Sequence, residues 1–182
     1  CTGHANYGNM ISSADGTSVG GCNEYNYNRD LLPYIKKWCE KVGIECYTDT
    51  PEVGKLHSLD DEINYYISHA DAKDYDLVVQ LHLNAYNEKA KGCEVWYYPS
   101  SAMGMQYANS VCNKLGTIWN NRGIKESKTL YWLRKTLAPS ILIESFFCDN
   151  SNDYLTAVKI GLDAHAKLIV EGILGKDITT YN

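Results

Sequence analysis

Two short runs of apolar and β-branched residues, at 76–83 and 140–147, set the architecture that this chain can adopt. Each run has the length of a strand and is largely apolar, which is typical of a strand buried on both faces of a sheet. Amphipathic helical patterns flank them, most clearly at 23–42 and 102–121, where apolar residues recur at helical spacing. Strands that alternate with helices predict a single α/β domain, with a mainly parallel mixed sheet of about six strands flanked by helices.

Weaker patterns predict the remaining elements. Strands are expected at 44–48, 93–98 and 129–133, and residues 1–4 are expected to be the end of a strand that starts upstream of Cys1. Further helices are expected after Ser58 and from Asn152 to Gly175, and Gly123 is expected to close the helix that starts at Ala102. We expect residues 1–176 to form the domain and residues 177–182 to be a polar tail or the start of a linker.

Charge and composition narrow the range of partners. The 182 residues include 17 Lys+Arg and 22 Asp+Glu, for a formal net charge of −5. This balance argues against nucleic acid as a partner, because phosphate binding requires clustered Lys and Arg. No apolar run approaches the roughly 18 to 20 residues of a membrane-spanning helix, so no membrane partner is expected either. Seven scattered cysteines without a CxxC pair predict free thiols and synthesis in a reducing cytoplasm.

Four side chains are candidates for chemistry. His4, His82 and Glu144 lie at or near the ends of expected strands, where open α/β sheets gather functional groups, and Glu24 opens the first helix after a glycine-rich loop. Two histidines and one carboxylate form a ligand set typical of catalytic zinc. In the alternative interpretation, His82 is a hydrogen-bonded core histidine, His4 is a loop residue and Glu24 is a carboxylate favoured by the helix macrodipole.

Glu144 is unusual because apolar residues surround it in the segment Ile141–Phe147. Ionisation of a carboxylate in such surroundings is costly unless a cation compensates, and a nearby metal would do so. The alternative is that Glu144 points out of the end of its strand or pairs with a lysine.

Four motifs, taken in chain order, resemble those of a known family. They are Gly3-His4, Asn23-Glu24, the segment His82-Leu83-Asn84-Ala85, and the segment 143–150 that contains Glu144. Together they resemble the zinc-dependent N-acetylmuramoyl-L-alanine amidases, which include bacterial autolysins and phage endolysins, and most closely the members from clostridia and their phages. The chain departs from the family pattern at Ala5, where many members have Gly, and at Gln80, where many have Ser.

The resemblance implies a function and a role for each candidate residue. His4, Glu24 and His82 would bind Zn²⁺, and Glu144 would act as general base and then general acid. The substrate would be peptidoglycan, cleaved at the amide between the lactyl group of N-acetylmuramic acid and the L-alanine of the stem peptide. The enzyme would be made in the cytoplasm and act on the bacterial cell wall after release or export. The chain leaves room for a C-terminal wall-binding domain that it does not itself contain.

Three alternatives stay open at the level of sequence. The chain could be a peptidoglycan-binding module without turnover, a zinc peptidase that cuts within the stem peptide, or a thiol hydrolase that uses a cysteine such as Cys22 beside a histidine. The other histidines are not expected at the site: His57 and His69 are predicted to be exposed, and His165 is predicted to be a partly buried core residue. Asn84 and Glu94 are candidate partners that would orient the imidazoles.

Overall fold

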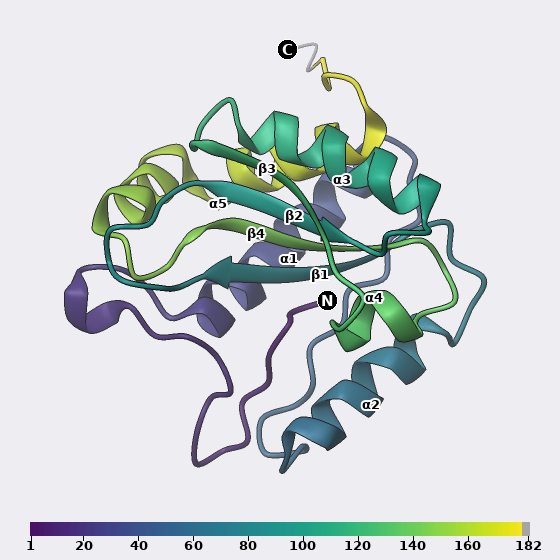
Figure 1. Ribbon diagram of the computed structural model, residues 1–182, viewed down its shortest axis with the longest axis horizontal. Helices are drawn as coiled ribbons and strands as arrows, with labels where there is room; N and C mark the ends of the chain where they lie inside the picture. The colour runs from purple at the N-terminus through teal and green to yellow at the C-terminus, as the bar shows by residue number, and fades with distance from the viewer. Residues whose placement is uncertain (180–182) are drawn as a thin grey trace.

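The computed structural model describes residues 1–179, which form one α/β domain around a four-stranded mixed sheet (Figure 1). The strands are β1 (Val78–Asn84), β2 (Cys93–Tyr97), β3 (Asn121–Glu126) and β4 (Ser140–Phe147), and their spatial order is β1-β4-β2-β3. β1 pairs in parallel with β4 and β2 in parallel with β3, whereas β2 and β4 are antiparallel. The predicted α/β class and mixed sheet are confirmed, but the expected number of about six strands is wrong.

Three long helices, α1 (Glu24–Lys41), α3 (Ala102–Leu115) and α5 (Ser151–Leu174), cover one face of the sheet. The larger core lies beneath them, where Leu81, Val95 and Ile143 of the sheet are almost fully buried. All three helices form near their predicted positions, because each presents apolar residues to this core. The side chain of Asn23 caps the start of α1 by accepting a hydrogen bond from the amide of Asn26.

Two shorter helices, α2 (Leu59–Ala70) and α4 (Tyr131–Lys135), pack on the opposite face. Ser58 is the N-cap of α2, as predicted, and accepts a hydrogen bond from the amide of Asp61. A second, smaller core joins these helices to Val78 of β1 and Leu142 of β4. Because these two helices are short, they leave part of this face of the sheet open.

Several predicted elements are wrong, and long-range contacts explain why. Residues 44–48 form no strand, because Ile44 and Cys46 pack against the core without a neighbouring strand to pair with. Most of the segment expected as a strand at 129–133 is instead helical in α4. The chain turns there because Ser127 Oγ accepts hydrogen bonds from the amides of Thr129 and Leu130, at 3.2 and 3.1 Å.

The helix expected at 102–121 ends at Leu115, six residues earlier than predicted. Trp119 donates a hydrogen bond to the carbonyl of Asp153 over 3.2 Å and fixes the turn that follows the helix. Asn121 then starts the edge strand β3, which contains Gly123, so Gly123 does not close the helix. The N-terminal segment forms a single parallel bridge, between Thr2 and Leu81, so it runs beside β1 without forming a full strand.

The last helix, α5, begins and ends close to the predicted residues, but it is interrupted at Gly161, which has a φ of 77°. α5 begins after the N-cap Asn150 and ends at Gly175, which adopts a left-handed conformation with φ of 66°. Residues 180–182 of the expected tail lie outside the described residues. Among residues 1–179, no helix has both the length and the apolar composition needed to cross a bilayer.

Candidate metal centre

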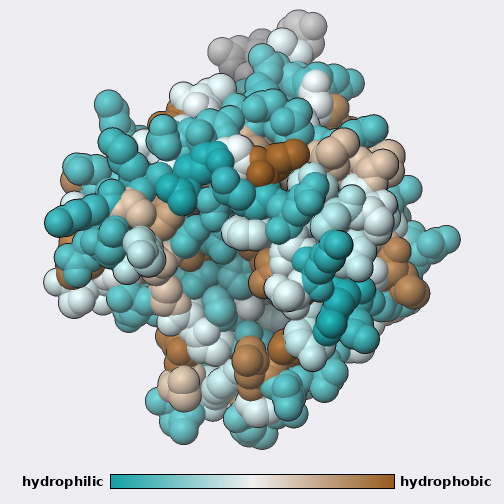
Figure 2. All heavy atoms as spheres, viewed as in Figure 1, coloured by the Kyte–Doolittle hydropathy of each residue, from teal (hydrophilic) through white to brown (hydrophobic). Residues whose placement is uncertain are grey.

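Strand register places three polar side chains in a row across the sheet. His82 of β1 lies opposite Glu144 of β4, and Glu144 lies opposite Glu94 of β2. Residues directly paired on neighbouring strands project to the same face of a sheet, which here is the face carrying α2 and α4. An open pocket of about 250 Å³ lies on this face and is lined by His4, His82 and residues of both helices. Figure 2 shows a hollow near the centre of the side in view.

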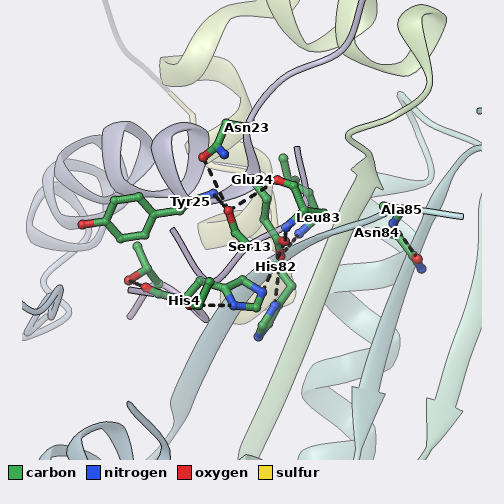
Figure 3. A network of polar contacts seen from close by, with 12 residues as sticks. His4, Ser13, Asn23, Glu24, Tyr25, His82, Leu83, Asn84 and Ala85 are labelled. Carbon is green, nitrogen blue, oxygen red and sulfur yellow. Dashed lines mark hydrogen bonds and ion pairs between the residues drawn. The ribbon is translucent and has the colours of Figure 1, made fainter. Parts of the chain in front are cut away.

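Two imidazoles and one carboxylate meet at the edge of the pocket. His4 Nε2 lies 3.3 Å from Glu24 Oε2, and His82 Nδ1 lies 3.0 Å from Glu24 Oε1. The two imidazole rings have centroids 4.8 Å apart and are nearly perpendicular. Figure 3 shows these side chains converging from three separate segments of the chain. The predicted trio of His4, Glu24 and His82 therefore forms one cluster.

Two glycines allow these segments to approach one another. A Cβ atom on Gly3 would lie 2.0 Å from His82 Nε2, so any larger residue would push His82 or the N-terminal segment away. A Cβ atom on Gly21 would lie 1.8 Å from the carbonyl oxygen of Cys148. The loop before α1 can therefore lie directly against the segment that follows β4, and this contact brings Glu24 to the edge of the sheet.

Hydrogen bonds keep Glu24 ionised although it is buried. The amide of Leu83 donates to Oε1 over 2.9 Å and the amide of Ala14 donates to Oε2 over 3.1 Å. Burial alone would raise the pKa of Glu24, but its contacts with His4 and His82 outweigh burial and hold the pKa well below its usual range. Glu24 therefore supplies a negative charge between two imidazoles.

The two imidazoles respond differently to this charge. Burial lowers the pKa of His82, which favours the neutral form that can bind a metal. Burial alone would lower the pKa of His4, but the nearby carboxylates of Glu24 and Glu62 overcome this effect and raise the pKa to about 9. Metal binding must therefore displace a proton from His4, because only a neutral imidazole nitrogen can be a ligand.

The donor set fits a zinc ion. One ligand atom from each of His4, Glu24 and His82 lies within 4.8 Å of the other two. Three protein ligands of this kind are typical of catalytic zinc sites, in which a fourth position remains open for water or substrate. The sequence-based hypothesis of a zinc site at these residues is thus geometrically reasonable, and the open pocket lies on the same side.

Glu144 lies beside this cluster with one carboxylate oxygen unsatisfied. In the described part of the chain, no hydrogen-bond partner reaches its buried Oε2 atom. Burial raises the pKa of Glu144 well above its usual value, and the negative charges of Glu24 and Glu94 raise it further. A carboxyl group with a raised pKa, next to a candidate metal centre, is suited to accept and return protons.

The residues expected to orient the imidazoles do not do so. Asn84 Nδ2 donates to Glu94 Oε1 over 3.0 Å, and Arg122 Nε donates to Glu94 Oε2 over 2.8 Å. Glu62 of α2, which the sequence analysis missed, instead lies 3.7 Å from His4 Nδ1. No local pattern distinguishes Glu62 from the other acidic residues at the start of α2, so only the packing of α2 against residues 4–12 reveals it.

The remaining candidates lie away from the cluster or are poorly suited to catalysis. Burial raises the pKa of Cys22 to about 12, which makes it a poor nucleophile and argues against a thiol hydrolase. His57 and His69 are exposed, as predicted. His165 is a core residue, as predicted, but it is fully rather than partly buried, and its Nδ1 lies 2.9 Å from the hydroxyl of Tyr27.

Comparisons with known proteins identify chains of similar sequence and fold. The catalytic domain of the CD27L endolysin targeting Clostridia Difficile shares 41% identity with this chain and superposes with a TM-score of 0.92, covering 98% of this chain and 96% of that one. N-acetylmuramoyl-L-alanine amidase AmiC2 of Nostoc punctiforme superposes with a TM-score of 0.75 over 94% of this chain and 91% of that one; at 24% identity, it shows the fold alone.

A curated relative and a family pattern extend these comparisons. The uncharacterized protein CPE1502 of Clostridium perfringens is 35% identical over 166 residues, which are 88% of this chain and 48% of that protein, so the chain spans about half the length of this relative. The pattern that defines the Amidase_3 family, N-acetylmuramoyl-L-alanine amidase, matches residues 2–174. Because this match runs through every segment that supplies the cluster and through Glu144, the chain belongs to the N-acetylmuramoyl-L-alanine amidase family.

Proposed function

We propose that this domain is a zinc-dependent N-acetylmuramoyl-L-alanine amidase that acts on peptidoglycan. It would hydrolyse the amide between the lactyl group of N-acetylmuramic acid and the L-alanine of the stem peptide. The observation that carries this proposal is the cluster of His4, Glu24 and His82 beside the buried carboxyl group of Glu144, in a member of the amidase family.

His4, Glu24 and His82 would hold the zinc ion. A bound zinc ion supplies a Lewis acid that polarises a carbonyl group and lowers the pKa of a water molecule from about 15.7 to about 7. The chain contributes the preorganisation of the site, because the amides of Leu83 and Ala14 fix both oxygens of Glu24. A buried carboxylate ligand that is held in this way needs little rearrangement when the metal binds.

Glu144 would move the proton. It would accept a proton from the attacking water and then deliver the same proton to the nitrogen of the leaving alanine. Burial raises the pKa of its carboxyl group, which favours the protonated form that would act as an acid in the second step. General acid–base catalysis of this kind typically contributes about 10²- to 10⁴-fold to the rate.

The pocket beside the cluster would receive the substrate. Its walls combine apolar side chains such as Ile63 of α2 and Trp132 of α4 with the polar side chain of Gln80 on β1. Binding sites for mixed polar and apolar ligands usually have this composition. A peptide bound here would have its scissile amide next to His4 and His82.

The first test is a digest of purified Gram-positive peptidoglycan, with and without a zinc chelator. New alanine amino termini that depend on zinc, without new reducing sugar ends, are the expected result. Mass analysis of the products separates this activity from that of a zinc peptidase, which would release amino termini from within the stem peptide. Activity that survives the chelator and is lost with iodoacetamide would indicate a thiol hydrolase, and absence of all products from zinc-loaded protein would indicate a binding module.

The proposal also covers the bounds of the catalytic domain, the compartment in which the protein is made and the class of its partner. Residues 1–176 would form the catalytic unit, and residues 177–182 a tail or the start of a linker that leaves room for a wall-binding domain. The cysteines of the chain are free thiols, which supports synthesis in a reducing cytoplasm before the enzyme reaches the cell wall. The acidic net charge of −5 agrees with a partner other than nucleic acid.

A further inference from the structure

A buried carboxylate outside the zinc-ligand trio lies behind His4. Glu62 is only 3% exposed, and its Oε1 atom lies 3.7 Å from His4 Nδ1. The other nitrogen of this imidazole, Nε2, faces Glu24. His4 is therefore placed between two carboxylates, one on the side of the metal cluster and one on the side of α2.

Two hydroxyl groups hold the Glu62 carboxylate in this position. Tyr7 Oη donates to Glu62 Oε2 over 2.9 Å, and Ser12 Oγ donates to the same atom over 2.5 Å. Both hydroxyls come from the loop that directly follows His4, which folds back on itself through a bridge between Asn6 and Ile11. A buried carboxylate with two donors on one oxygen keeps its other oxygen free to face His4.

The groups around His4 Nδ1 determine whether this nitrogen carries a proton. Ser12 Oγ lies 3.4 Å from His4 Nδ1, and its single proton is directed to Glu62 at the shorter distance. The groups that face Nδ1, the Ser12 oxygen and Glu62 Oε1, thus both act as acceptors, so Nδ1 must carry the proton. Nε2 also faces an acceptor, Glu24 Oε2 at 3.3 Å, so the contacts favour a proton on each nitrogen of the metal-free ring; when a metal takes the place of the proton on Nε2, the acceptors at Nδ1 keep the other proton there.

The same helix also anchors the backbone of His4. Tyr66, one turn after Glu62 on α2, donates from its hydroxyl to the carbonyl oxygen of His4 over 2.8 Å. Tyr66 is itself buried and lies 2.6 Å from Thr2 Oγ1. α2 therefore holds both the main chain and the side chain of His4, so the position of Glu62 relative to the imidazole is fixed.

We propose that Glu62 is a positioning residue that fixes the ring orientation and tautomer of His4, so that Nε2 is presented to the metal. This inference rests on the proposed zinc site and adds to it a carboxylate–histidine pair whose members come from α2 and the N-terminal segment. Carboxylates that support a ligand histidine in this way typically change metal affinity by about 10- to 100-fold when they are removed.

The test measures zinc affinity of the domain by competition with a chromophoric chelator. Glu62→Gln is expected to weaken zinc binding by about 10- to 100-fold, and Glu62→Asp, which keeps the charge, is expected to recover part of the loss. The visible spectrum of the Co²⁺-loaded Glu62→Gln protein is expected to differ from that of the wild type, because the orientation of one ligand changes. Zinc affinity of Glu62→Gln within twofold of the wild-type value would overturn the proposal.

Two control variants separate positioning from general effects on folding. Asp60→Asn removes an exposed charge from the same helical turn, and Glu171→Gln removes a carboxylate that is also buried but belongs to α5. Both are expected to keep wild-type zinc affinity, and a loss in Glu171→Gln as large as in Glu62→Gln would assign the effect to reduced stability instead.

Ser12→Ala removes one of the two hydrogen bonds that hold the Glu62 carboxylate, but it leaves the carboxylate itself in place. It is expected to weaken zinc binding less than Glu62→Gln does, and to have little additional effect in the Glu62→Gln background, because the two groups act through one contact. Fully additive effects would contradict the proposed network. If His4→Ala also keeps its zinc affinity, the proposed metal site itself fails; if only Glu62→Gln keeps it, the positioning role alone fails.

Discussion

At the scale of single residues, the proposed roles of Glu144 and of the histidines as zinc ligands can be tested separately. Glu144 sits on the central strand β4 with one buried oxygen unsatisfied, and it is not among the three groups that converge as candidate ligands. His82 sits on β1 at the paired position and contacts Glu24 directly. Substitutions at these two positions should therefore separate proton transfer from metal binding.

Glu144→Ala should retain zinc and lose turnover. We expect kcat to fall by about 10²- to 10⁴-fold, because the proton acceptor and donor is removed while all three ligands remain. Zinc content by metal analysis and release of alanine amino termini from peptidoglycan are the two measurements. Glu52→Ala, at an exposed position, is the matched control. A Glu144→Ala protein with near-normal turnover would show that the role is assigned to the wrong residue.

His82→Ala should lose both zinc and activity. A ligand that binds only the folded state stabilises it by about 2.7 kcal/mol when its concentration is 100 times its Kd. Thermal unfolding of the wild type should therefore shift between zinc and chelator, whereas unfolding of His82→Ala should not. His57→Ala, which removes an exposed histidine, should behave like the wild type. A zinc-dependent shift that persists in His82→Ala would contradict the ligand assignment.

At the scale of elements, the site depends on how closely the N-terminal segment approaches β1. The amide of Gly3 donates to the carbonyl of Leu81 over 2.9 Å, and the amide of Leu81 donates to the carbonyl of Cys1 over 2.9 Å. This pairing places His4 beside the end of β1 that carries His82. Because the segment lies directly against the His82 ring, the pairing leaves no room for a side chain at position 3.

Gly3→Ala should disrupt the metal centre more than it disrupts the fold. The added methyl group would overlap His82 Nε2, and such overpacking typically costs about 1 to 3 kcal/mol or displaces the ring. We expect at least a tenfold loss of zinc affinity, measured by chelator competition. Gly43→Ala is the control, because Gly43 has a φ of 78° with open space around it, so the added strain of about 1 to 2 kcal/mol lies far from the site. Equal zinc affinities of the two variants would argue against this steric role.

At the scale of the whole molecule, the larger core contains a buried polar pair that makes stability depend on pH. His165 of α5 is fully buried between Tyr27 of α1 and the rings of Trp119 and Phe146. Burial lowers the pKa of His165 to about 3 from an ordinary value of 6.5. The folded protein therefore keeps this imidazole neutral in a pH range where the unfolded chain protonates it.

The free energy of unfolding should fall as the pH drops below about 6.5. Between about pH 6.5 and pH 3 the unfolded state binds a proton at His165 that the folded state does not, so acid favours unfolding. At pH 5 this residue should cost about 2 kcal/mol relative to neutral pH. Urea unfolding of the metal-free protein at several pH values measures the slope, which should be flatter in His165→Phe but unchanged in His57→Gln. An identical slope in His165→Phe and the wild type would contradict this origin of the acid sensitivity.

Comparison of the predicted with the observed helices and strands shows how much of the fold could be predicted from the sequence. The helices α1, α2 and α5 and the strands β1 and β4 were predictable, because each depends on a local pattern: an apolar stripe, a capping residue or a continuous buried run. The predictions failed at β3 and α4, which depend on distant partners. β3 forms because it pairs with the free edge of β2, and α4 is held in place partly by the hydrogen bond from Trp132 to the carbonyl of Ile141.

The chemical identity of the site was determined by the sequence itself. The residue types at His4, Glu24, His82 and Glu144, in their order along the chain, identify the family and the candidate ligands, because a metal site requires particular side chains. Only the tertiary structure decided which nitrogen of each imidazole faces Glu24, why Glu144 is unsatisfied, and that Glu62 lies behind His4. These properties depend on strand register and helix placement, which arise from contacts between residues far apart in the chain and leave no local pattern in the sequence.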